Sequence, residues 1–106
     1  MSTIYIKRND TASVLQDQLL LDGVAINLTG ATVSLCTKNN RTGASLKRSA
    51  AIVNALTGQV EYQLIAEDTA TVGDHLVEWE IIFGNGRILT VPDNDWHIMK
   101  IVEDLG

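Results

Sequence analysis

The stretch HLVEWEIIFGNGRILTVP, residues 75–92, carries the longest alternating pattern of side chains in this chain. Val77, Trp79 and Ile81 occupy every second position, and side chains two residues apart on a strand point to the same face. Two glutamates lie between them, on the opposite face. This pattern predicts a central strand that buries Trp79 in the core of the protein.

The same stretch contains a hairpin signal. Asn85 and Gly86 lie between two alternating runs, and an Asn-Gly pair in this position predicts a two-residue turn with positive φ at both residues. Ile88 to Val91 is then the returning strand. Pro92 ends that strand, because proline has no N–H to donate to a neighbouring strand.

Shorter alternating runs fill the rest of the chain, and we find no helical stripe. In the run from 13 to 20, Leu15 and Leu19 share one face, while Val14 and Leu20 share the other. Turn signals separate the runs, and one of them contains Gly58, which is free to take positive φ. The expected strands are residues 4–7, 13–20, 24–28, 32–38, 46–53, 60–64 and 96–102, with one helical turn at 66–70.

Many short strands separated by turns predict an all-β fold. The spacing of the strands is typical of a sandwich or a barrel. A buried Trp on a central strand favours an immunoglobulin-like antiparallel β-sandwich of about seven to nine short strands. The 106 residues, of which 45% are hydrophobic, are enough for one core, so we expect a single domain over residues 1–106. Cys36 is the only cysteine, so no intrachain disulfide can form and packing alone must hold the sandwich together.

No stretch has the features of a membrane span or of a signal peptide. The apolar runs are only a few residues long, whereas a helix that crosses a bilayer needs about 20 apolar residues. The first residues lead directly into polar alternation, without a basic region followed by an apolar one. We therefore expect that the chain is synthesised in a cytoplasm and does not insert into a membrane.

The charge is negative and unevenly distributed. The formal net charge of −5 argues against a nucleic acid as the main partner. Residues 1–48 carry six Lys or Arg against three Asp or Glu, whereas residues 49–106 carry two against ten. A solvated surface explains this division most simply. The alternative is electrostatic complementarity between copies of the chain in an assembly.

Side chains that could perform chemistry are few and scattered. His75 fits an ordinary, partly exposed strand histidine that could pair with Asp74, and His97 is the only other histidine. Cys36 has no basic neighbour in the sequence and fits a small buried or sheet-face residue. The best metal candidate, residues 93–95 (Asp-Asn-Asp), lacks the glycine and the distal glutamate of an EF-hand loop. We therefore predict no enzyme activity, no catalytic residue, no cofactor and no metal site.

The aromatic residues allow a second hypothesis. Exposed together, Tyr5, Tyr62, Trp79 and Trp96 would form a platform for stacking sugars, as in a carbohydrate-binding or adhesion module. Their strand positions favour core packing for Tyr62 and Trp79. Trp96 follows an acidic turn and is a candidate interface residue.

Several segments carry a resemblance to a known family. INLTGATVSL, residues 26–35, resembles the vdLTGATV motif in the N-terminal domain of phage upper baseplate proteins, the BppU N-terminal domain family. Residues 4–28 are similar to the opening strands and hairpin of that family, and IVNALTGQVEYQL, residues 52–64, is similar to its central strand and turn. VGDHLVEWEIIFGNGRILTVP, residues 72–92, and WHIMKIVEDL, residues 96–105, resemble its last hairpin and closing strand. The order of these segments agrees over nearly the whole chain.

The resemblance implies an immunoglobulin-like sandwich in the tail or baseplate of a phage or prophage virion. In such a place the domain docks structural proteins together and carries receptor-binding parts, without enzyme activity. The implied partners are other phage tail or baseplate proteins, and synthesis would take place in the cytoplasm of the bacterial host. We rank this structural role first, a carbohydrate-binding module second and a small enzyme third.

The resemblance also bears on assembly. Phage tails have threefold or sixfold symmetry. The resemblance therefore implies either a homo-oligomer, namely a trimer or a hexamer, or docking on a neighbour that has this symmetry. A basic segment at residues 38–48 could face an acidic patch on the next copy. Lys47 and Arg48 in this segment are therefore, with Trp96, the candidate interface residues.

Overall fold

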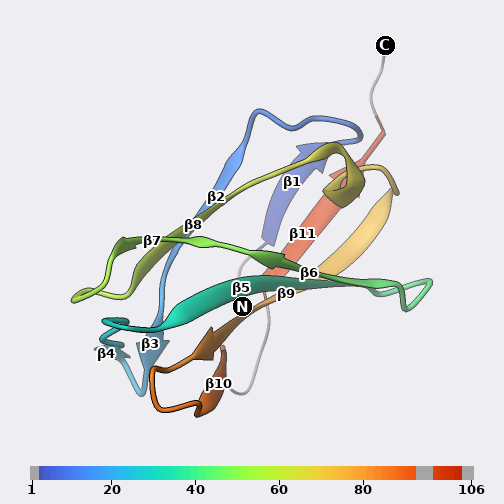
Figure 1. Cartoon of the computed structure of the whole chain (residues 1–106). Helices are drawn as coiled ribbons and strands as arrows, with labels where there is room; N and C mark the ends of the chain where they lie inside the picture. The colour runs from blue at the N-terminus through green and yellow to red at the C-terminus, as the bar shows by residue number, and fades with distance from the viewer. Residues whose placement is uncertain (1–2, 93–96, 104–106) are drawn as a thin grey trace.

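The structure is a computed structural model that describes residues 3–92 and 97–103 (Figure 1). Nearly all of the described chain is strand or turn, and the only helical element is one short 3-10 turn, η1 (Ala66–Asp68), where one helical turn was expected. The strands in chain order are β1 (Thr3–Lys7), β2 (Val14–Gln18), β3 (Leu20–Leu21), β4 (Val24–Ala25), β5 (Thr32–Asn39), β6 (Ser45–Ser49), β7 (Ala51–Asn54), β8 (Gln59–Gln63), β9 (Gly73–Ile82), β10 (Ile88–Val91) and β11 (His97–Val102).

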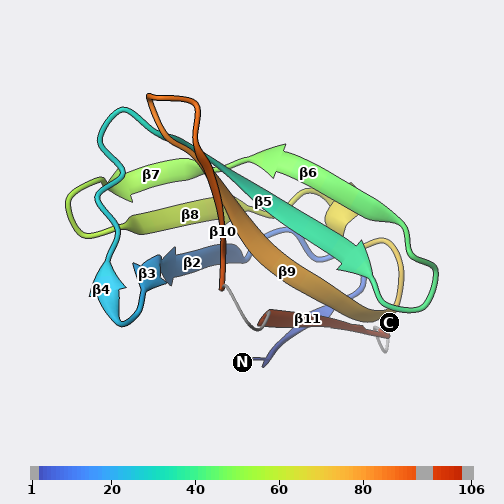
Figure 2. The same cartoon turned by 90° about the horizontal axis from the view of Figure 1, so that it is seen from below.

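Two sheets pack face to face. The larger sheet has the order β1-β11-β9-β5-β6, with β10 also paired to β9, and the smaller sheet has the order β2-β8-β7. β3 and β4 form a separate two-stranded hairpin. Figure 2 shows β7, β8 and β2 side by side in one layer and β6, β5 and β9 in the other. The all-β, immunoglobulin-like sandwich expected from the sequence is confirmed.

One edge of the larger sheet departs from the antiparallel expectation. β1 pairs with β11 in parallel, with Tyr5 opposite Lys100. Parallel neighbours need a long connection, whereas antiparallel neighbours can be joined by a short hairpin. Here the connection is almost the whole chain, because β1 is the first strand and β11 the last.

The expected strand at 46–53 is two strands in the structure. β6 pairs with β5 in the larger sheet, and β7 pairs with β8 in the smaller one. The chain changes sheet at Ala50, whose N–H donates to the Val33 carbonyl at 2.9 Å while its side chain packs against the core. Strands that switch sheets in this way close the corner of a sandwich. Together with the two-residue strands β3 and β4, this division raises the number of strands above the expected range.

The β9–β10 hairpin is confirmed, but its predicted turn geometry is wrong. The Phe83 N–H donates to the Arg87 carbonyl at 2.9 Å, and the Gly86 N–H donates to the Phe83 carbonyl at 2.8 Å. The loop therefore has three residues, and of the Asn85-Gly86 pair only Gly86 has a positive φ, 86°. This is a three-residue hairpin loop with glycine in the left-handed position. Gly84 supplies the third residue, which the two-residue prediction left out.

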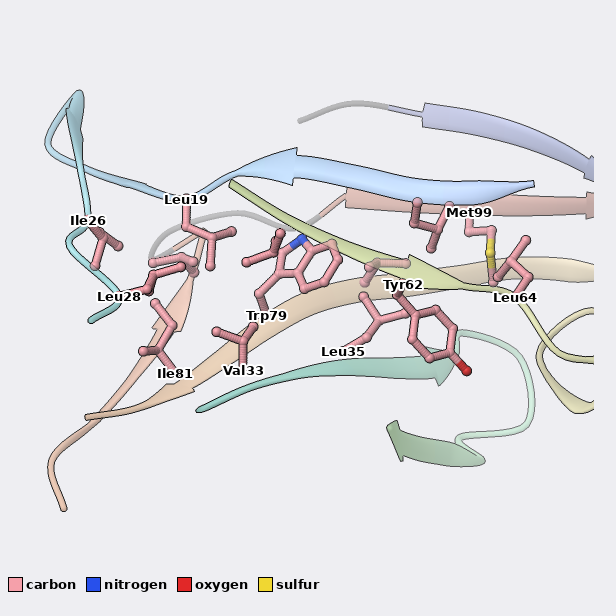
Figure 3. Packing of buried hydrophobic residues seen from close by; sticks show 14 of the residues in the cluster. Leu19, Ile26, Leu28, Val33, Leu35, Tyr62, Leu64, Trp79, Ile81 and Met99 are labelled. Atoms are coloured by element: carbon pink, nitrogen blue, oxygen red, sulfur yellow. The ribbon is translucent and has the colours of Figure 1, made fainter. Parts of the chain in front are cut away.

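The core lies between the two sheets, and Trp79 is at its centre. Val77, Trp79 and Ile81 on β9 are 4%, 2% and 0% exposed, as the alternation predicts. Figure 3 shows the indole ring between the two layers, with its nitrogen directed toward β2. The other buried hydrophobic residues are Ile6, Leu15, Leu19, Ile26, Leu28, Val33, Leu35, Val60, Tyr62, Leu64, Val91, Met99 and Ile101.

Candidate interaction surface

Three polar side chains from both sheets meet at one edge of the sandwich. Trp79 Nε1 donates a hydrogen bond to Asp17 Oδ2 at 3.0 Å, and His97 Nε2 lies 2.9 Å from the same oxygen. Asp17 belongs to β2 in the smaller sheet, whereas Trp79 and His97 belong to β9 and β11 in the larger one. The Asp17 carboxylate therefore links the two sheets, and we call these three side chains the inter-sheet clasp.

The position of Asp17 on β2 explains the clasp. Asp17 lies two residues from Leu15 and two from Leu19, both of which are buried, so its side chain points toward the larger sheet. A buried indole N–H needs an acceptor, because an unpaired buried donor costs about 1–3 kcal/mol. The carboxylate supplies that acceptor while its side chain remains 28% exposed.

A groove of about 430 Å³ opens beside the clasp. Residues of β2 line it from the smaller sheet, and residues of β1, β9 and β11 line it from the larger one. Most of the lining is apolar and includes Ile4, Ile6, Leu15 and Val77. Among the lining residues that the structure describes, the only ionisable side chains are the clasp residues Asp17 and His97. We call this feature the seam groove.

A second polar contact holds η1 against β8. Tyr62 donates its hydroxyl hydrogen to Asp68 Oδ2 at 2.6 Å, and the Ile65 N–H donates to the same oxygen at 2.9 Å. Asp68 is only 3% exposed. Burial raises the pKa of Tyr62 well above its ordinary value, and the hydrogen bond to Asp68 raises it further. This carboxylate is therefore used to hold the fold together.

The Tyr62→Phe variant is expected to lose about 1.5–3 kcal/mol of unfolding free energy near neutral pH, because a buried hydrogen bond to the Asp68 carboxylate is removed. The folded protein keeps the Tyr62 phenol protonated above the ordinary pKa of 10.0. Below that pH Tyr62 makes its full contribution to the free energy of unfolding. Above it the unfolded chain releases the proton first, so the contribution falls as pH rises. Urea unfolding of both proteins at about pH 8 and about pH 11 should show the difference shrinking. An unchanged difference would contradict the raised pKa.

Lys47 and Arg48 lie on opposite faces of β6 and do not form one patch. Lys47 pairs across the strands with Cys36, on the outer face of the larger sheet, and its Nζ lies 2.5 Å from Glu80 Oε1. Arg48 lies opposite the buried Leu35 and forms an ion pair with Glu67 of η1. Each cation is thus already paired within the chain, in a different place.

The other residues considered for chemistry are engaged in the fold or lie outside the described part of the chain. The expectation of a partly exposed histidine at position 75 is wrong, because His75 lies on the inner face of β9 and is only 8% exposed. Its Nε2 is 2.9 Å from the Thr71 carbonyl oxygen. Cys36 is half-buried, and burial and the nearby Glu80 raise the pKa of its thiol, which disfavours the reactive thiolate. Trp96 and residues 93–95 lie outside the described residues.

The described aromatic residues do not form a sugar-binding platform. Tyr62 and Trp79 are 7% and 2% exposed, within the core. Tyr5 is exposed on the outer face of β1, which points away from the core. The Lys100 ammonium lies 5.9 Å from the centre of the Tyr5 ring. Within residues 3–92 and 97–103, no three His, Cys, Asp or Glu side chains gather closely enough to hold a metal ion. No helix in the same ranges is long and apolar enough to cross a bilayer.

A two-layer sandwich whose inward carboxylates tie its sheets and its 3-10 turn together defines an immunoglobulin-like β-sandwich. The comparison with protein families gives the particular kind. The chain belongs to the BppU N-terminal domain family, whose model matches residues 2–90. The resemblance found in the sequence is thereby confirmed, and the family is one of phage baseplate structural domains.

Solved structures agree with this fold. The N-terminal domain of phage TP901-1 ORF48 is similar with a TM-score of 0.69 at 13% sequence identity, over 97% of this chain and 85% of that one. CopC from Methylosinus trichosporium OB3b is similar with a TM-score of 0.58 at 9% identity, over 100% of this chain and 89% of that one. A search of curated protein sequences gave no match. At these identities the two structures support the fold alone.

Proposed function

We propose that this protein is a non-enzymatic structural component of a phage or prophage tail or baseplate. It acts by docking onto other tail proteins during virion assembly or host attachment. The observation that carries this proposal is the family match over residues 2–90, because the matched family consists of phage baseplate domains. The virion is then its working location, after synthesis in the cytoplasm of the host.

The roles of its polar residues support a docking role. Asp17 and Asp68 hold elements of the sandwich together, and His75 is bonded to a main-chain carbonyl. What the fold offers to a partner is therefore surface: the outer face of the larger sheet, the open edges of both sheets and the seam groove. The partners we propose are other tail or baseplate proteins, and not nucleic acids, since the net charge is −5.

Self-assembly into trimers or hexamers is part of the proposal, and Lys47 and Arg48 are its candidate contacts. Because they lie on opposite faces of β6, they need separate variants, Lys47→Glu and Arg48→Glu. Each change also breaks an ion pair within the chain. The matched control for Lys47 is the exchange Lys47→Glu with Glu80→Lys, which keeps that ion pair in reversed orientation.

The test is co-purification of this chain with the tail proteins encoded beside its gene, followed by sizing with light scattering at low and high salt. We expect a stable complex with at least one of these proteins. A salt-sensitive contact is expected to weaken at high salt, where the screening length falls to about 3 Å at 1 M. Absence of any complex with any of these proteins would contradict the docking role. A monomer at every concentration and salt would contradict self-assembly only.

A further inference from the structure

The smaller sheet is too narrow to cover the larger one. It ends at β2, whereas the larger sheet continues from β9 through β11 to β1. Ile4 on β1 is in register with Met99 on β11, so both side chains point to the inner face of the sheet. Met99 is fully buried, but Ile4 is 38% exposed and lines the seam groove. The inner face of the larger sheet is therefore partly uncovered at this edge.

The wall of the groove formed by β2 is an open strand edge. The Leu64 N–H donates to the Ser13 carbonyl, and the Leu19 N–H donates to the Gly58 carbonyl, so the main-chain groups of Ser13 and Leu19 face β8. Hydrogen-bonded and non-bonded positions alternate along an antiparallel pair. Val14, Gln16 and Gln18 therefore direct their main-chain N–H and C=O groups away from β8, on the open side of the sheet.

At one of these three positions the N–H already has a partner within the chain. The Gln18 N–H donates to Asp17 Oδ1 at 2.8 Å. Val14 and Gln16 remain, and both line the seam groove. Each offers one N–H and one C=O to an added strand, in the spacing at which an antiparallel or parallel neighbour forms its bonds.

We propose that the seam groove receives an extended segment of a partner tail protein, which pairs with β2 as a fourth strand of the smaller sheet. This inference rests on the proposed docking function and deepens it by naming the surface and the form of the partner. Adding a strand to an open sheet edge combines main-chain hydrogen bonds with pockets for every second side chain. The added strand would cover Ile4 and complete the second layer.

The charges of the groove determine the chemistry of the segment. Its described ionisable lining groups are Asp17 and His97, and the Asp17 carboxylate already binds His97 and the Trp79 indole. A charged side chain placed inside would lose water without gaining a free opposite charge. The segment is therefore uncharged where it enters, with apolar side chains at alternate positions directed toward Ile4 and Val77.

A polypeptide segment of a partner fits the groove better than a small apolar molecule or a second copy of this chain. A small apolar molecule would fill volume, but it would leave the main-chain groups of Val14 and Gln16 without partners. Each described strand of a second copy is already paired within that copy, so it could enter the groove only with its whole sheet and not as a single extended segment. β2 has five residues, so the segment would span about 17 Å at 3.4 Å per residue.

The decisive variant is Gln16→Pro. It removes the Gln16 N–H that faces the groove but no bond to β8, and proline is tolerated at such a position of an edge strand. The matched control is Gln16→Thr, which also removes the Gln16 side chain and its 3.4 Å contact with Glu61 but keeps the N–H. Circular dichroism and thermal unfolding of both variants establish that each is folded.

The experiment measures binding of wild type and both variants to the purified tail proteins encoded beside the gene, with hydrogen exchange of the wild-type complex. We expect the dissociation constant to rise at least tenfold for Gln16→Pro and to change little for Gln16→Thr. We also expect the Val14 and Gln16 amides to become protected from exchange in the complex.

Other results would overturn the inference in distinguishable ways. A tail protein that binds Gln16→Pro as tightly as wild type would refute the groove but leave the proposed function standing. Self-association of this chain alone that depends on the Gln16 N–H would replace the partner segment with a second copy. Binding of none of the tail proteins would refute both the docking function and the groove.

Discussion

Trp79→Ala is expected to lower the free energy of unfolding by about 3–5 kcal/mol, the usual cost of truncating a buried aromatic side chain to alanine. Trp79 is 2% exposed between the two sheets, and its neighbours belong to both of them. The change leaves a cavity in the middle of the core and removes the hydrogen bond to Asp17. Urea or guanidinium unfolding followed by circular dichroism measures the loss.

Trp79→Phe is the control that separates the cavity from the hydrogen bond. Phenylalanine keeps an aromatic ring in the core but cannot donate to Asp17, so its cost is expected to be smaller, about 1–2 kcal/mol. The volume of the side chain, and not the indole N–H, should thus account for most of the alanine effect. A loss below about 1 kcal/mol for Trp79→Ala would contradict the register of β9 and the position of the core.

Gly58→Ala is expected to be the other strongly destabilising change, with a loss on the order of 3 kcal/mol. Gly58 has a φ of 70°, and a Cβ there would lie 2.7 Å from the Leu19 carbonyl oxygen and 2.9 Å from that of Ile26. Both are main-chain atoms that cannot turn away as a side chain can. The Leu19 N–H also donates to the Gly58 carbonyl at 2.8 Å, which fixes this close approach. The measurement is again the midpoint and slope of denaturant unfolding.

Gly86→Ala provides the matched control for Gly58→Ala. Gly86 has a similar left-handed backbone, with a φ of 86°, but a Cβ there would meet no atom within 4 Å. Only the backbone strain remains, which costs about 1–2 kcal/mol for an L-residue. Equal losses in the two variants would mean that the contact of Gly58 with the main chain at Leu19 and Ile26 does not exist.

Much of the fold was predictable because this chain alternates strictly where one face is buried. Leu15 and Leu19 on one face of residues 13–20, and Val77, Trp79 and Ile81 on β9, are buried as the alternation predicts. A one-residue shift in such a strand would move every apolar side chain to the wrong face, so the register is visible in the sequence. The same reasoning predicted the hairpin between β9 and β10.

Long-range features were not predictable in the same way. A single alternating run, residues 46–53, does not reveal that the chain leaves one sheet and joins the other at Ala50. The parallel pairing of β1 with β11 joins the two ends of the chain and has no local signal. The hairpin loop differed by one residue because a glycine with positive φ at position 86 suits both the second position of a two-residue loop and the last position of a three-residue loop.

The inter-sheet clasp was missed, although one signal for it was present. Asp17 lies between Leu15 and Leu19 on the face that the alternation assigns to the core, and an inward carboxylate needs a partner. The sequence does not name that partner, because Trp79 is 62 residues away and His97 is farther still. Lys47 and Arg48 are adjacent in the sequence, which suggests one basic patch, but alternation along β6 places them on opposite faces.

If this chain is a structural part of a phage tail, as we propose, it must be found in the tail of the virion. Virions produced by the phage or induced prophage that carries the gene would be purified and labelled with gold-coupled antibody against this chain, then viewed by electron microscopy. This location predicts label concentrated at the tip of the tail and the chain present among the virion proteins by mass spectrometry. Virions free of the chain, or label on the capsid alone, would contradict it.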